Sequence, residues 1–249
     1  MKLDLLALAA HPDDVELACA GTMLMTKRAG KRAGIVDCTR GELSTRGTLE
    51  SRARETEAAS KILELDYRAN LKMHDGNIEL SQENLNRVII QLRKTRPTIL
   101  LAPSPNERHP DHEAAAELAH RAAFYAGLVK IETTDEEGNA QEPHRPLLVL
   151  HYLQSYSFEP KIIMDVTPVF EERMRAMEAF GSQFATRPGH EAATSERMTI
   201  LATPGFVEGL RARAAHYGMM IGVRYAEPFW AHEPLGTKDL FSLVTKTIA

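Results

Sequence analysis

Two short clusters of histidine and aspartate are the residues of this sequence best suited to chemistry. Residues 11–14 read His-Pro-Asp-Asp, and residues 109–112 read His-Pro-Asp-His. Neutral imidazole and carboxylate are good zinc ligands, and a catalytic zinc usually takes three protein ligands and leaves one position for water. Two histidines and one aspartate would leave a further aspartate to take a proton from that water as general base. The clusters therefore predict a metal site that supports hydrolysis.

The residues alone leave the ligand set open. The first cluster offers His11 with either Asp13 or Asp14, and the second cluster offers His109 or His112. One such cluster can equally be a turn with a helix cap, because aspartate favours caps and proline is tolerated in the first helical turn. Two clusters that both follow apolar runs favour the metal site.

Those apolar runs, at residues 3–10 and 98–102, predict how the clusters are positioned. A continuous apolar run of this length is typical of a strand covered on both faces, as in a parallel sheet. The loops at the carboxyl ends of such strands form the ligand crevice. We therefore expect both clusters at the same edge of one sheet.

Strand and helix patterns alternate through the first half of the chain. The expected strands are 3–10, 32–39, 67–71 and 98–102, and the expected helices are 15–29, 49–65, 84–95 and 113–127. This order predicts an α/β fold, a Rossmann-like and mostly parallel sheet flanked by helices, with the metal site at the carboxyl ends of the strands. The first loop lacks the Gly-x-Gly-x-x-Gly pattern, which argues against a dinucleotide.

The second half is less regular. Further strands are expected at 147–152 and 161–166, and helices at 169–179 and 206–217. The polar residues 133–142 predict an exposed hairpin or loop, and residues 186–193 predict a loop near the site. His120 and His216 lie inside expected helices and are interpreted as surface or packing residues.

Composition indicates a compact enzyme. The 249 residues are 43% hydrophobic, enough for one core, so we expect a single domain over residues 1–249. A net charge of −4 provides no basic field for nucleic acid. The first apolar run, broken by Asp4, is interpreted as a strand, and no stretch is long enough to span a membrane. With Cys19 and Cys38 expected as buried free thiols, we expect a cytoplasmic protein without nucleic-acid or membrane partners.

At the two clusters the chain resembles the PIG-L/LmbE-like zinc-dependent N-acetylglucosaminyl deacetylases. Residues 41–48, 52–55, 178–184 and 225–229 are similar to the branch of that family that removes acetate from N-acetylglucosaminyl malate in bacillithiol biosynthesis. The resemblance implies a small-molecule N-acetylglucosamine conjugate as substrate and Zn²⁺ as cofactor, with another divalent metal such as Fe²⁺ as a substitute. It also implies a homo-oligomer.

The resemblance assigns a role to each residue of the clusters. The metal ligands would be His11, Asp14 and His112. Asp13 would be the general base. His109 would stabilise the tetrahedral oxyanion or protonate the leaving amine, with Asp111 orienting its ring.

Substrate contacts are implied by four further residues. Arg52 matches an arginine with which the family holds the sugar, and its planar fork would suit the malate carboxylate or sugar hydroxyls. Arg145 matches a second substrate arginine. Glu42 and Ser44 follow the second expected strand, at the edge where sugar hydroxyls would be contacted. Some relatives have tyrosine where Phe206 stands, so a hydroxyl that could assist the oxyanion is missing here.

Three alternatives remain open on the sequence. The enzyme could deacetylate another N-acetyl sugar or cleave thiol-conjugate amides. Two histidines and a carboxylate also describe a non-haem iron oxygenase, although a spare Asp13 beside the metal suits hydrolysis better. A non-catalytic metal- or sugar-binding protein would need neither Asp13 nor His109.

Overall fold

The computed structural model describes residues 1–184 and 197–246. Its centre is a sheet with the strand order β3-β2-β1-β4-β5-β7-β6. The strands are β1 Leu5–Ala9, β2 Ala33–Asp37, β3 Tyr67–Asn70, β4 Ile99–Pro103, β5 Leu148–Tyr152, β6 Ile162–Asp165 and β7 Ala226–Trp230. Strands β1 to β5 pair in parallel, and β7 is antiparallel to both β5 and β6. The prediction of a mostly parallel α/β sheet is confirmed.

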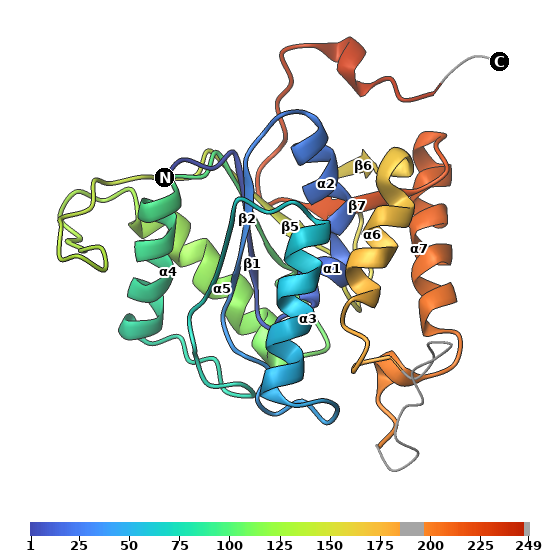
Figure 1. Cartoon of the computed structure of the whole chain (residues 1–249). Coiled ribbons are helices and arrows are strands. Elements are labelled where there is room, and N and C mark those ends of the chain that lie inside the picture. Colours follow the sequence, from blue (N-terminus) through green and yellow to red (C-terminus); the bar gives the residue numbers. More distant parts are fainter. Residues whose placement is uncertain (185–196, 247–249) are drawn as a thin grey trace.

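Helices cover both faces of the sheet (Figure 1). They are α1 Asp14–Ala18, α2 Ala20–Arg28, α3 Leu49–Ile62, α4 Gln82–Thr95, α5 Pro110–Tyr125, α6 Phe170–Glu178 and α7 Phe206–Ile221. Short 3-10 helices lie at Thr167–Val169, Ile200–Ala202 and Leu240–Leu243. One buried core contains side chains of α4 and α5, and the other contains side chains of α1, α2, α3, α6 and α7. The wholly apolar β1, buried at every residue, contributes alternate side chains to each core.

The strand order explains where ligands can bind. Strand β1 pairs with β2 on one side and with β4 on the other, so the chain direction of the connections reverses between β1 and β4. In open α/β sheets the crevice lies at such a switch point, outside the carboxyl ends of the strands. The two clusters follow β1 and β4 and therefore open into the same crevice.

Three expectations from the sequence needed correction. The helix expected over 15–29 is two helices, α1 and α2, which are separated at Cys19 with φ −143°. The helix expected from 113 begins earlier, at Pro110, because proline suits the first helical position and His109 caps it. Strand β7, which contains Pro228, was not expected at all.

Other expectations hold. Residues 134 and 140 form an antiparallel bridge within the polar segment 133–142, as in a hairpin. Cys19 and Cys38 are buried free thiols. In the part of the chain that the structure describes, no helix is long and apolar enough to cross a membrane. The loop expected at 186–193 lies outside the described residues.

Candidate metal centre

The loops after β1 and β4 bring the two clusters into contact. Asp14 begins α1, and His112 lies in the first turn of α5. Asp13, which precedes Asp14 in the chain, has φ 123°, a conformation that residues with a Cβ rarely adopt. Strain of this kind persists where the surrounding structure enforces it, and it is frequent at functional sites.

One group of three side chains has the arrangement of a metal site. Asp14 Oδ2 lies 3.7 Å from His11 Nδ1, and Asp14 Oδ1 lies 3.3 Å from His112 Nε2. Ligand atoms of the three residues lie within 4.8 Å of one another. Two imidazoles and one carboxylate are donors that zinc accepts, and three protein ligands leave a position open. The residues present therefore fit the metal that the sequence led us to expect.

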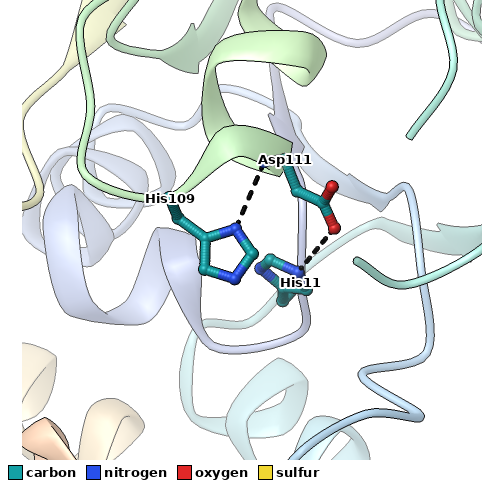
Figure 2. A group of neighbouring side chains, drawn as sticks. All are labelled: His11, His109 and Asp111. Carbon is teal, nitrogen blue, oxygen red and sulfur yellow. Dashed lines mark hydrogen bonds and ion pairs between the residues drawn. The ribbon is translucent and has the colours of Figure 1, made fainter. Parts of the chain in front are cut away.

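The second nitrogen of His11 is held by carboxylates. His11 Nε2 lies 3.0 Å from Asp75 Oδ1. It also lies 3.3 Å from Asp111 Oδ2, a contact shown in Figure 2. A metal-binding histidine usually donates its other N–H to a carboxylate or a carbonyl, which fixes the ring. The contacts of Nε2 therefore leave Nδ1 as the metal-binding atom of His11, on the side of Asp14.

A second group, His11 with His109 and Asp111, is equally compact (Figure 2). Its atoms are already used in other contacts, however. The Asp111 carboxylate accepts hydrogen bonds from the backbone N–H groups of Gly76 at 2.7 Å and Ile78 at 3.2 Å. His109 Nδ1 accepts the backbone N–H of Asp111 at 3.2 Å. We therefore favour His11, Asp14 and His112 as the ligand set.

The role expected for Asp111 is corrected in one respect. Its carboxylate orients His11, and only its backbone N–H orients the His109 ring. Because Nδ1 of His109 accepts a hydrogen bond, the proton of the neutral ring is on Nε2. Burial lowers the pKa of His109, and the neighbouring His11 and His112 lower it further. His109 is thus a neutral ring with one N–H to donate.

Arg52 is engaged with the expected general base. Arg52 Nη1 donates to Asp13 Oδ2 at 2.8 Å and to the Pro12 carbonyl at 2.5 Å, and Nη2 donates to Ser44 Oγ at 3.1 Å. Both side chains of the Arg52–Asp13 pair are buried. The arginine expected to hold the substrate therefore holds the base, and Ser44 supports the arginine.

The two adjacent aspartates differ in electrostatics. Burial raises the pKa of Asp13 to about 6, against the opposing charge of Arg52 and with a further increase from Asp14. Burial also disfavours ionised Asp14, but His112 and His11 outweigh it and hold the pKa of Asp14 well below its usual range. Two carboxylates whose pKa values are pushed apart are typical of two separate roles. Asp14 suits a permanently charged ligand, and Asp13 suits a base near neutral pH.

The remaining expected contacts are placed less centrally. Glu42 is half-buried, and its carboxylate accepts the backbone N–H groups of Arg40 at 3.1 Å and Asp75 at 3.3 Å. Arg145 is exposed before the amino end of β5, and its guanidinium stacks on Phe124 at 4.5 Å. The structure does not bring Arg145 to the site, because it lies at the opposite end of the sheet.

Sequence reasoning missed two residues, and it expected Asp75, after the third strand, to line the crevice or contact substrate, whereas the structure shows it holding His11. Gln154, which follows β5, donates to Asp14 Oδ1 at 2.8 Å. Glu107 Oε2 lies 4.0 Å from His112 Nδ1, a buried nitrogen with no hydrogen-bond partner among the described residues. All three positions follow carboxyl ends of strands, and that location was the available signal.

A cavity of about 770 Å³ opens over these side chains. Its size is that of a small-molecule site. Apolar residues form part of the wall: Leu17, Leu43, Tyr156, Phe206 and Leu210. Two cations that the sequence did not single out, Arg108 and Arg213, also line it. The cavity can therefore hold a substrate with apolar faces and an anionic group.

Known proteins are similar to this chain in fold and in part of its sequence. Residues 6–123 match the family model described as PIG-L, GlcNAc-PI de-N-acetylase. A diacetylchitobiose deacetylase of Thermococcus kodakarensis is 29% identical over 232 residues, which cover 89% of this chain and 80% of that protein. The crystal structure of the conserved protein TT1542 from Thermus thermophilus has 35% identity and a TM-score of 0.83, and the match covers 96% of this chain and 98% of that one.

A third match is a crystal structure of the N,N'-diacetylchitobiose deacetylase from Pyrococcus horikoshii with an inhibitor. It has 26% identity and a TM-score of 0.76, over 92% of this chain and 83% of that one. Residues 6–123 are thus similar to the PIG-L family, and the deacetylases among these matches share the fold of the whole chain.

Proposed function

We propose that this protein is a metal-dependent hydrolase that removes the acetyl group from an N-acetylglucosamine conjugate. One observation carries the proposal: the buried Asp13 lies beside the group formed by His11, Asp14 and His112, at the floor of a substrate-sized cavity. The deacetylases among its relatives support the same reaction. A binding protein would have no use for the buried base.

The metal would be held by His11, Asp14 and His112. Zn²⁺ suits this donor set, and Fe²⁺ also accepts two histidines and a carboxylate. When bound there, the ion would polarise the acetyl carbonyl and lower the pKa of water.

The chain's own groups would then manage the protons. Asp13, held by Arg52, would accept a proton from the attacking water. The water oxygen would bond to the acetyl carbon, and the C–N bond would break to give acetate and a free amine. His109 Nε2–H would donate to the developing oxyanion or to the leaving nitrogen, because its other nitrogen is occupied by the backbone.

Two cations in the cavity wall, Arg108 and Arg213, favour a conjugate with carboxylates, and N-acetylglucosaminyl malate, the bacillithiol precursor, is our specific proposal. Arg52 is already paired with Asp13, so other cations must receive the malate. Arg108 is exposed at the cavity, and no carboxylate of residues 1–184 or 197–246 pairs with its side chain. Arg213 donates to the carbonyls of Leu17, at 3.1 Å, and Gln154.

Product analysis tests the proposal. Zinc-loaded protein would be incubated without oxygen with N-acetylglucosaminyl malate, methyl N-acetylglucosaminide and diacetylchitobiose, and acetate and amine would be measured by mass. We expect the malate conjugate to react fastest and Asp13→Asn to lose most of its activity on all three. Faster turnover of diacetylchitobiose would contradict N-acetylglucosaminyl malate as the preferred substrate. If no substrate released acetate, the proposed deacetylase activity would be wrong. A reaction that required oxygen would favour an oxygenase.

A further inference from the structure

Three further histidines gather away from the proposed active site. His120 lies on α5, His151 on β5, and His232 two residues after β7. The ring centroids of His120 and His232 are 4.9 Å apart, and those of His151 and His232 are 5.5 Å apart. His120 lies about 12 Å along α5 from His112, because each helical residue advances 1.5 Å. The group is therefore separate from the first centre.

His151 has the protonation state of a metal ligand. It is 1% exposed, and its Nδ1 lies 2.7 Å from the Pro103 carbonyl oxygen. A carbonyl only accepts, so Nδ1 carries the proton and Nε2 carries the lone pair. Nε2 is buried and has no hydrogen-bond partner among residues 1–184 and 197–246. Metal-binding histidines are commonly fixed in this way, with one N–H on a backbone carbonyl and the other nitrogen free for the ion.

The spacing of the ring centroids also fits an ion, although the ring nitrogens do not lie as close together as in the first group, so the rings must turn to share one. Two imidazoles that bind one tetrahedral ion at about 2.0–2.1 Å have ring centroids roughly 5 Å apart. His232 stands at this spacing from both His120 and His151. His120 and His232 are exposed, and within the described chain neither makes a hydrogen bond or ion pair that would resist turning its ring toward a shared ion.

We propose that His120, His151 and His232 form a second site, which binds a divalent transition-metal ion such as Zn²⁺. Imidazole donors suit Zn²⁺, Cu²⁺ and Ni²⁺, and they exclude Mg²⁺ and Ca²⁺, which take oxygen ligands. No carboxylate of the described residues pairs with any of the three rings, so this site holds no group comparable to Asp13. Its effect is mechanical: the ion ties the segment after β7 to β5 and α5.

Metal stoichiometry tests this site. Chain without a histidine tag would be stripped of metal, dialysed against Zn²⁺ and measured by elemental analysis. We expect a second equivalent of zinc in the parent chain. His232→Ala and His120→Ala should each lose that equivalent and keep the first. His216→Ala, at an exposed histidine of α7, is the matched control and should keep both.

Thermal unfolding in a His112→Ala background provides a readout that the first centre does not affect. Zn²⁺ should raise the melting temperature of this variant, because an ion that binds only the folded chain stabilises it. Adding His232→Ala should abolish the shift, whereas adding His216→Ala should not. A second equivalent that survives both His120→Ala and His232→Ala would overturn the proposal, as would its absence from the parent chain.

Discussion

Helix α5 contributes to two histidine clusters that differ in their surroundings. Near its first turn, His109 and His112 meet His11 among four aspartates, at positions 13, 14, 75 and 111. Two turns further on, His120 meets His232 and His151 beside the ring of Trp230, whose centroid lies 4.5 Å from that of His232. The first cluster is rich in carboxylates, and the second has none in ion-pair contact within the described chain.

The carboxylates of the first cluster make different contacts. Asp14 lies between two histidines, Asp13 is available as a base, and Asp75 with Asp111 fixes the His11 ring. In the second cluster the Pro103 carbonyl fixes His151, and no side chain can take a proton from water. Imidazoles alone can bind an ion, and hydrolysis needs the added base. On the two proposals made above, the first cluster would use a metal for hydrolysis and the second would only hold one.

Removal of the base should have the largest effect. Asp13→Asn preserves shape, but an amide cannot accept a proton, so we expect kcat to fall about 10²–10⁴-fold. Zinc content at both clusters should be unchanged, as measured by elemental analysis beside steady-state kinetics. A fully active, metal-loaded Asp13→Asn enzyme would remove the chemical distinction between the clusters and assign the base elsewhere.

The second-largest effect is expected at Arg52, which is paired with the expected base Asp13. Arg52→Ala leaves Asp13 buried without its cation, and breaking a buried ion pair costs about 3–5 kcal/mol of the free energy of unfolding. Urea denaturation measures this loss, and Arg52→Lys should restore part of it. Because Arg52 holds the base, kcat/KM should fall alike for N-acetylglucosaminyl malate and methyl N-acetylglucosaminide. A loss of kcat/KM confined to the malate conjugate would show that Arg52 contacts the substrate.

The contact of Glu107 with the expected metal ligand His112 gives the third prediction. Glu107→Gln removes the charge that faces His112 Nδ1, and loss of such a partner typically weakens metal affinity about 10–100-fold. Competition with a zinc chelator measures the affinity. Glu117→Gln, at a half-buried residue of α5 paired with Arg121, is the control. An equal loss of affinity in both variants would show that the loss of any nearby carboxylate charge, and not the contact with His112, weakens binding.

Substrate charge is tested at Arg108. Arg108→Ala should lower kcat/KM for N-acetylglucosaminyl malate by about 1.5 kcal/mol, roughly tenfold, the low end for hydrogen bonds to charged groups. The uncharged methyl glycoside should be unaffected, so the ratio of the two rates is the measurement. An unchanged ratio would exclude Arg108 from recognition of the carboxylates.

The smallest effect is expected at Arg145. Its guanidinium contacts the exposed Phe124, three turns along α5 from His112 and away from the first cluster, so Arg145→Ala should leave kcat/KM unchanged for every substrate. The unfolding free energy should fall by no more than about 1 kcal/mol, the range for an exposed cation–aromatic contact. A selective loss on the malate conjugate would restore this residue to the site.

The sequence predicted the parts of the fold and site that depend on strand ends. Apolar runs before residues 11 and 109 placed both clusters at one sheet edge, and β1 and β4 are indeed neighbours. Strand β7 was missed because Pro228 lies within it and proline argues against a paired strand. It pairs on both sides despite the proline, so tertiary context overrides the local preference.

Individual contacts were beyond the sequence because they depend on loop backbone and helix rotation. Nothing in the spacing of Asp111 shows that its N–H and its carboxylate serve two different histidines. Arg52 faces Asp13 through the way α3 packs beside the loop after β1. His120, His151 and His232 share no motif and come from three separated elements, so the interpretation of His120 as a packing residue considered it alone.

Two independent roles constrain which residue can stand at position 109, the cap of α5. His109 accepts the Asp111 N–H at the start of the helix, and the same ring presents its other nitrogen to the cavity. Serine and asparagine are better helix caps than histidine, so folding alone would replace it. On the mechanism proposed above, a homologue with serine or asparagine at this position would keep the helix and lose the proton donor. Position 109 therefore offers a single-residue marker for members of this fold that no longer cleave their ligand.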